Sequence, residues 1–116
     1  MDIRQTRRDD VIHLTLIGKL WHPDDIRNLR AAIKAAAESD IRALVVDLSR
    51  LSFMCSLGLG VLVRMFVKLR DSGIELVFAG PKQGIHDMIE LSGLTSVIRT
   101  VGSPEGFNTR ASSRDS

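Results

Sequence analysis

The chain has 116 residues, 44% of them hydrophobic, and this length suits one domain with a single hydrophobic core. Sixteen basic and fourteen acidic residues leave a formal charge of +2, and only four Phe and one Trp supply aromatic rings. So small a charge and so few rings for stacking bases argue against nucleic acid as the partner. We therefore expect a globular domain that recognises something other than a polyanion.

Cysteine usage and hydropathy favour a cytoplasmic protein. Cys55 is the only cysteine, so no intramolecular disulfide is possible. The first ten residues, MDIRQTRRDD, lack the apolar core of a signal peptide. The longest apolar region, 51–67, is interrupted by serines, glycines and Arg64 and falls short of the roughly 20 apolar residues of a membrane span. We expect no direct insertion into a membrane.

The first third of the chain predicts two strands and a helix. Residues Val11 to Ile17 alternate apolar and polar side chains, as in a strand with one buried face, and a weaker strand signal precedes them at Ile3 to Arg7. The pair His22-Pro23 followed by two aspartates is typical of a helix start, because proline suits the first position and acids suit the dipole. The apolar face of this helix continues to about Glu38.

Two short, nearly continuous apolar runs predict strands that are buried on both faces of a largely parallel sheet. A helix of about four turns separates them and is followed by a glycine suited to a C-terminal cap. In chain order we predict strand Ala43–Leu48, helix Ser56–Ser72 with Gly73 after it, strand Ile74–Gly80, helix Pro81–Ser92 and strand Ser96–Val101.

These elements predict an α/β fold: one small domain with a mixed, mostly parallel sheet of four to five strands and helices in crossover connections. The segment from Ser103 to Glu105 begins like a capped helix, but Phe107 is the only large apolar group near it. We therefore place the domain at residues 1–108, with a short helical turn near its end. A disordered polar tail is expected at 109–116.

Ser56 interrupts the apolar stretch FMCSLGLGVLV and poses the main functional question. We expect it to end a loop of about seven residues and to form the N-cap of the following helix, where its oxygen would accept from free backbone N–H groups. A phosphorylated Ser56 would also be tolerated there, because a helix N-terminus favours anions. The residue is either a cap alone or a cap that also serves as a switch.

Enzymatic interpretations find little support in the residues. Gly58 and Gly60 begin like a dinucleotide-binding fingerprint, but Val63 occupies the third glycine position and the preceding loop is too long. These glycines are better suited to the close approach of another backbone. His13, His22 and His86 show no spacing to acids that suggests a triad or a metal site. We expect no enzymatic activity, no cofactor and no metal.

The sequence allows two roles for each of two side chains near Ser56. Cys55 is either a reactive thiol at a helix N-terminus or a small buried hydrophobe beside Phe53 and Met54. Trp21 follows the second strand, so it should lie at the same sheet edge as Ser56. It is either buried in the core or exposed as an interface anchor.

The segment LVVDLSRLSFMCSLGLGVLVRMFVKLRDSGIELVFAGPKQGIHDMIELSGLTSVI, together with LIGKL before the first helix, resembles the STAS domain of anti-sigma factor antagonists. The resemblance covers nearly the whole chain and rests on three motifs that agree in order and spacing. It implies a small α/β domain that binds an anti-sigma factor with serine kinase activity. The kinase would phosphorylate the antagonist and eject it, and a serine phosphatase would restore binding.

The resemblance places the phosphorylated serine at Ser56 and the partner-binding surface around it. Three departures accompany this serine: Cys55 stands where the family usually has Asp, Leu57 where it has Ser or Thr, and Trp21 where a second acid is common. The predicted partner-binding residues are Trp21, His22, Met54, Cys55, Ser56, Leu57, Gly58 and Gly60.

Two functional hypotheses follow from the resemblance and its departures. In the first, the protein is an anti-sigma factor antagonist, monomeric when free, that regulates transcription by partner switching through Ser56. In the second, it is a non-phosphorylated STAS subunit of a transporter, lipid-trafficking or ligand-sensing assembly, and Ser56 is only a cap. The missing acids favour the second hypothesis, whereas the serine with its glycines favours the first.

Overall fold

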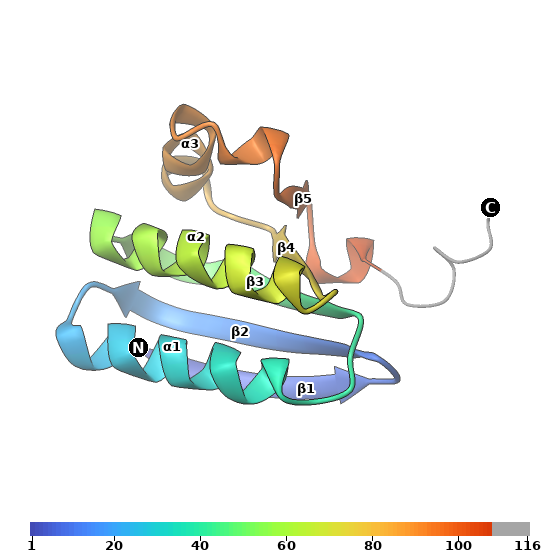
Figure 1. The fold of residues 1–116 in the computed structure, drawn as a ribbon. Helices are drawn as coiled ribbons and strands as arrows, with labels where there is room; N and C mark the ends of the chain where they lie inside the picture. The colour runs from blue at the N-terminus through green and yellow to red at the C-terminus, as the bar shows by residue number, and fades with distance from the viewer. Residues whose placement is uncertain (108–116) are drawn as a thin grey trace.

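A computed structural model describes residues 1–107 and shows one five-stranded sheet with three α-helices (Figure 1). The predicted polar tail, 109–116, lies outside the described residues. In chain order the elements are β1 (Asp2–Arg8), β2 (Val11–Leu20), α1 (Pro23–Ala37), β3 (Ala43–Met54), α2 (Ser56–Asp71), β4 (Glu75–Ala79), α3 (Gln83–Leu91), the 3-10 turn η1 (Leu94–Ser96), β5 (Arg99–Val101) and the 3-10 turn η2 (Pro104–Gly106).

The strands lie in sequence order, β1-β2-β3-β4-β5, with β1 antiparallel to β2 and the other pairs parallel. The predicted fold class is therefore confirmed. Each βαβ connection leads to the next strand on the same side of the previous one. Because such crossovers are right-handed, every helix then lies on the same face of the sheet. Accordingly, α1, α2 and α3 all pack into the same core cluster, and α1 and α2 lie side by side in Figure 1.

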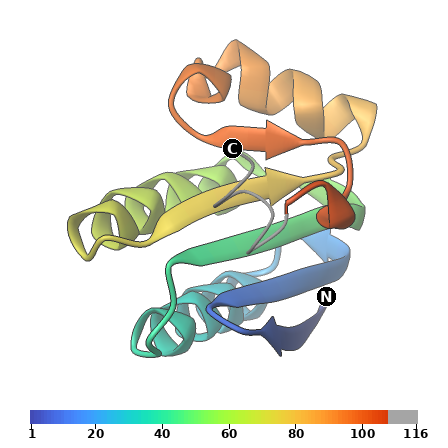
Figure 2. The same cartoon turned by 90° about the vertical axis from the view of Figure 1, so that its right-hand side faces the viewer.

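The core is divided unequally between the two faces of the sheet. On the helix-covered face, alternate residues of β2, β3 and β4 pack against the three helices in one large cluster. On the opposite face a small cluster contains Val11, Ala43, Val45, Val77, Ala79 and Phe107. Phe107 follows η2, which lies over this face of the sheet (Figure 2). Within residues 1–107, none of the helices has the length and apolar character that crossing a bilayer would require.

The expected loop before Ser56 is not present, and this prediction was wrong. β3 continues for twelve residues to Met54, because β2 also continues past Ile17 and supplies pairing partners as far as Leu20. Two register shifts in this ladder accommodate the extra length, between Thr15 and Ile17 and between Gly18 and Lys19. The two strands therefore carry the site rigidly on hydrogen-bonded backbone.

Smaller differences concern element ends. α3 begins at Gln83 rather than Pro81, and the expected strand Ser96–Val101 is shortened to Arg99–Val101 because η1 occupies its start. The expected start of α1 is confirmed, with Pro23 as its first residue and two aspartates in its first turn. Gly73 has a φ of 78° after the C-cap of α2, as a helix-terminating glycine should.

Candidate functional site

The candidate site lies where β2 and β3 end at the same edge of the sheet. Leu20 pairs with Met54 as the last rung of the parallel ladder, and the Cys55 amide donates to the Leu20 carbonyl at 2.9 Å. The next residues, Trp21 and Ser56, therefore leave the sheet side by side, and α1 and α2 begin here. The proximity expected of Trp21 and Ser56 is confirmed.

Three residues near this edge carry large apolar side chains that remain in solvent. Trp21 is 61% exposed, Leu57 58% and Phe53 47%, and we refer to these three residues as the apolar patch. The exposure of Trp21 excludes the interpretation that it is a core residue. An exposed cluster of this kind in a small domain is typical of a protein interaction site, and tryptophan is the side chain most enriched among binding hot spots.

Phe53 was not among the predicted contact residues, although the structure exposes its side chain. Within β3, Leu51 and Met54 are buried while Ser52 and Phe53 are exposed. The irregular pairing with β2 near Gly18 breaks the strict alternation of faces along the strand. A pattern of period two alone would not have predicted that Ser52 and Phe53 are both exposed.

Ser56 is exposed and is the first residue of α2, not its N-cap, so the N-cap prediction was wrong. Cys55 keeps an extended backbone, with φ −81° and ψ 164°, and is therefore the last residue before the helix. Its Sγ accepts a hydrogen bond from the Gly58 amide at 3.4 Å. Among the described residues, none hydrogen-bonds the Ser56 hydroxyl, which leaves it free to react or to contact a partner.

The start of α2 suits an added anion. The first turn of this helix contains no acidic side chain, and its cap is a sulfur, which is a weak acceptor. The partial positive charge of the helix N-terminus is therefore not compensated locally. A phosphate on Ser56 would lie in this favourable field and would add nearly two negative charges at the edge of the sheet that carries the apolar patch.

The remaining predicted contact residues divide into supporting and accessible ones. Met54 is only 2% exposed and packs in the core beneath the patch. Gly58 is also buried, and a Cβ at this position would lie 2.8 Å from the Leu20 side chain, so a larger residue here would force Leu20 or α2 to shift. A Cβ on Gly60 would meet only the tip of Arg64 at 4.0 Å, which leaves room for a partner.

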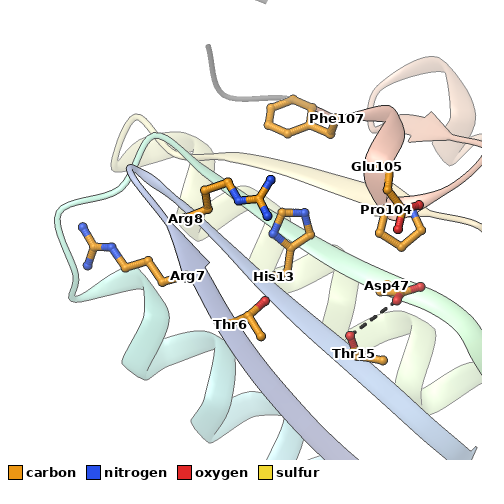
Figure 3. A pocket seen from close by; sticks show the side chains of 9 residues that line it. All are labelled: Thr6, Arg7, Arg8, His13, Thr15, Asp47, Pro104, Glu105 and Phe107. Carbon is orange, nitrogen blue, oxygen red and sulfur yellow. Dashed lines mark hydrogen bonds between the residues drawn. The ribbon is translucent and has the colours of Figure 1, made fainter. Parts of the chain in front are cut away.

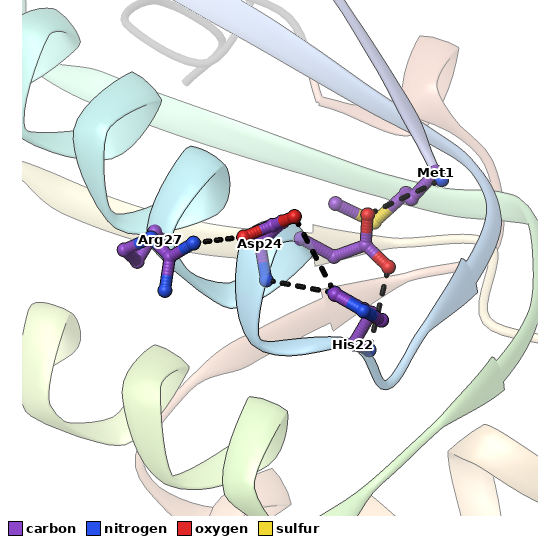
Figure 4. A network of polar contacts seen from close by, with 5 residues as sticks. Met1, His22, Asp24 and Arg27 are labelled. Atoms are coloured by element: carbon purple, nitrogen blue, oxygen red, sulfur yellow. Dashed lines mark hydrogen bonds and ion pairs between the residues drawn. The ribbon is translucent and has the colours of Figure 1, made fainter.

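His22 forms the N-cap of α1 beside the patch. Its Nδ1 accepts from the Asp24 amide at 3.1 Å, and its own amide donates to Asp25 Oδ2 at 3.4 Å, which completes a capping box (Figure 4). Asp25 Oδ1 also accepts from the amino group of Met1 at 3.3 Å. The imidazole is exposed and engaged with its own helix, so it orients α1 and stands at the edge of the patch.

The other two histidines belong to other elements, and neither hydrogen-bonds Ser56 within residues 1–107. His13 is on β2 and faces the side of the sheet that lacks helices. His86 is on α3, where its ring and the carboxylates of Asp87 and Glu90 place their ligand atoms within 4.8 Å of one another on the surface. Because no imidazole hydrogen-bonds the Ser56 hydroxyl within residues 1–107, the site lacks the paired base that a serine nucleophile requires.

The fold and the site together define a small α/β domain with one exposed serine at the carboxyl edge of a parallel sheet, where the residues of the apolar patch also lie. The family model described as the STAS domain matches residues 2–112. The chain belongs to the STAS domain family.

Relatives and solved structures agree with this assignment. A putative anti-sigma factor antagonist from Bordetella bronchiseptica, BtrV, is 32% identical over 77 residues, which is 66% of each chain. An anti-sigma-B factor antagonist from Listeria monocytogenes is 40% identical over 55 residues, 47% of this chain and 48% of the relative. The aligned segments therefore span just under two thirds and about half of these relatives.

The solved structures extend the likeness to almost the whole chain. Unphosphorylated SpoIIAA, an anti-sigma factor antagonist, superposes with a TM-score of 0.79 over 99% of this chain and 98% of its own, at 20% identity. An anti-sigma factor antagonist from Mycobacterium paratuberculosis has a TM-score of 0.74 at 27% identity, covering 90% and 87% of the two chains. At 20% identity, the likeness to SpoIIAA shows that the two chains share a fold.

Proposed function

We propose that this protein is an anti-sigma factor antagonist that is switched by phosphorylation of Ser56. The observation that carries the proposal is the position of one exposed, unpartnered hydroxyl among Trp21, Phe53 and Leu57. The names of the relatives from Bordetella and Listeria support the antagonist role. The protein acts as a binding module without catalysis of its own.

Switching follows from the physical chemistry of the patch. When Ser56 is unmodified, the patch docks on an anti-sigma factor and buries its apolar side chains, which releases the sigma factor for transcription. The anti-sigma factor is a serine kinase that transfers the γ-phosphoryl group of ATP to the Ser56 oxygen, so that the bond to the β-phosphate breaks, ADP leaves and the hydroxyl proton is released. The resulting dianion would have to be desolvated in an apolar contact, which costs several kcal/mol and separates the partners. A serine phosphatase removes the phosphate and restores binding.

The departures from the family motif determine the chemistry of the partner surface. Cys55 and Leu57 flank the serine, and Trp21 follows the neighbouring strand end, so none of these three positions supplies a carboxylate. A basic partner surface would find few opposite charges here. We therefore propose that the matching surface of the anti-sigma factor is apolar and that affinity depends weakly on ionic strength.

The test is the intact mass of the protein purified from its own host, compared with Ser56→Ala and Ser52→Ala variants. Ser52 is a matched control, because it is exposed in the same stretch but donates its hydroxyl to the Gly18 carbonyl at 3.0 Å. We expect a phosphate-sized adduct on the wild type and on Ser52→Ala that is lost in Ser56→Ala. Calorimetry with the anti-sigma factor should then show binding to the unmodified protein only.

The alternative outcome is also informative. No adduct under several growth conditions, with unchanged partner binding, would identify a constitutive binder. No adduct and no anti-sigma partner would favour the second hypothesis, a non-switching STAS subunit of a larger assembly. An adduct that persists in Ser56→Ala would contradict the assignment of the switch to this residue.

A further inference from the structure

The sheet face opposite the helices is half covered and half open. Its apolar half, over β3 and β4, contacts Phe107, which is only 6% exposed. Its other half consists of the polar side chains that β1 and β2 direct away from the helices. Between the two halves lies a cavity of about 550 Å³, which we call the polar pocket (Figure 3).

One side of the polar pocket is basic. Arg8 extends from the end of β1 over β2, and His13 lies near the start of β2, paired across the ladder with Thr6 (Figure 3). Within residues 1–107, the side chains of Arg8 and His13 have no hydrogen-bond or ion-pair partner. Their donors therefore remain available to an acceptor that enters the pocket.

The opposite side is acidic. Asp47 is the one buried charged residue of the described chain and is 8% exposed. Its Oδ1 accepts from the Ser49 amide at 2.9 Å and from the Ser49 hydroxyl at 2.7 Å, whereas its Oδ2 accepts only from the Thr15 hydroxyl at 3.4 Å. A carboxylate offers about four lone-pair positions, so Oδ2 has free capacity towards the pocket. The carboxylate of Glu105 lines the same side from η2.

Phe107 forms a fixed wall of the pocket. The guanidinium groups of Arg42 and Arg99 lie 5.4 and 5.5 Å from the centroid of its ring, a distance typical of cation–π contacts. Arg99 is in turn paired with Glu75 at 3.1 Å. The ring is therefore held in place on the sheet, and the pocket it borders is largely formed before any ligand arrives.

The spacing of the two charged sides favours a small ligand with two charges. His13 pairs with Val45, and Asp47 lies two residues further along the same strand, so strand geometry separates His13 and Asp47 by about 8 Å. A simple anion would satisfy Arg8 and His13 but would face the carboxylates of Asp47 and Glu105. A simple cation would be attracted by Asp47 and Glu105 but would be repelled by Arg8. A molecule with an anionic group at one end and an ammonium group at the other satisfies both sides.

We propose that the polar pocket binds a small zwitterion, with its phosphate or carboxylate group against Arg8 and His13 and its ammonium group against Asp47 and Glu105. The ammonium group donates to Asp47 Oδ2, and the carbon chain contacts Phe107. This site lies on the face of the sheet away from the helices. It is independent of phosphorylation at Ser56 and of the identity of the partner.

The experiment is an amide NMR titration of the full chain with phosphoethanolamine, compared with inorganic phosphate alone and ethanolamine alone. We expect saturable shifts at Thr15, Asp47 and Phe107 with phosphoethanolamine. Each single-charge probe should bind at least tenfold more weakly, because it leaves one charged side of the pocket unpaired. Binding should be unchanged in Ser56→Ala, which separates this result from the proposed function.

Two variants and one control locate the ligand. Arg8→Ala and Glu105→Gln, both at exposed positions where folding is tolerant, should each weaken phosphoethanolamine at least tenfold. Arg4→Ala is the matched control, because Arg4 lies on the same strand but outside the pocket lining. The absence of a saturable shift would overturn the proposal. So would equal binding of phosphate alone, or an equal loss in Arg4→Ala, since either result would indicate only diffuse attraction of anions to basic residues.

Discussion

The starts of α1 and α2 lie next to each other at one edge of the sheet, yet their free backbone N–H groups are capped differently. α1 has a full capping box, in which His22 Nδ1 and the Asp25 carboxylate accept backbone donors, and two acids occupy its first turn. α2 has one sulfur acceptor, from Cys55, and no acid in its first turn. The helix dipole is therefore compensated at α1 and open at α2.

This difference separates a structural helix start from a functional one. A negative charge near a helix N-terminus contributes about 0.3–1 kcal/mol, and α1 already obtains this from its own sequence. At α2 the same stabilisation is available to a group that arrives later, such as a phosphate on Ser56. The apolar patch spans both starts, with Trp21 before α1 and Leu57 in the first turn of α2.

The largest expected effect is on partner binding at the α1 side of the patch. Trp21→Ala should weaken binding to the anti-sigma factor by about 2 kcal/mol or more, roughly 30-fold, because a large exposed ring is lost without disturbing the core. Calorimetry measures this loss. Leu91→Ala is the control, since Leu91 is exposed on α3 outside the patch and its removal should leave affinity unchanged. An unchanged affinity in Trp21→Ala would remove this residue from the interface.

The next largest effect is on the stability of the fold, and it tests the capping box at the start of α1. Asp25→Ala should destabilise the fold by about 1–2 kcal/mol in urea unfolding, because it removes an acceptor for the His22 amide and for the amino group of Met1. Asp24→Ala is the paired control, since the Asp24 carboxylate is exposed and contacts Arg27 on the surface. Its effect should stay within about 0.5 kcal/mol. Equal effects would mean that the capping box does not stabilise α1.

Gly58 and Gly60 of α2 differ in the space available for a side chain. Gly58→Ala should destabilise by about 1 kcal/mol, because the new Cβ would lie 2.8 Å from the buried Leu20 side chain, a clash only partly offset by the better helix propensity of alanine. Gly60→Ala should stabilise by about 0.5–1 kcal/mol, because space is open there. Thermal unfolding of both variants measures this contrast, and stabilisation in both would contradict the close packing at Gly58.

The smallest effect tests whether α2 lacks a strong cap. Cys55→Asp should stabilise the protein by about 0.5–1 kcal/mol, since a carboxylate would replace a sulfur acceptor 3.4 Å from the Gly58 amide and would oppose the positive helix end. The gain should shrink as salt is added, whereas the stability of wild type should change less. A loss of stability in low salt would show that burial of the Cys55 side chain outweighs its role as a cap.

Much of the fold could be predicted from local patterns. Continuous apolar runs marked the buried strands β3 and β4, and the His22-Pro23 pair with two aspartates marked the start of α1. Ser56 could be selected because it interrupts an apolar stretch ahead of a helix. The one-residue error at the N-cap has a simple cause: serine is a better cap than cysteine by propensity, but backbone geometry assigns the position to Cys55.

The sequence by itself determined the strand and helix order, the location of Ser56 at the start of α2 and its apolar neighbours, because these depend on periodicity and on adjacent residues. Only the tertiary structure decided that β3 continues to Met54, that Trp21 and Phe53 are exposed beside Ser56, and that Gly58 rather than Gly60 is enclosed. It also brought Arg8, His13 and Asp47 around one pocket. These features depend on strand pairing and packing between segments distant in the chain, which no local pattern encodes.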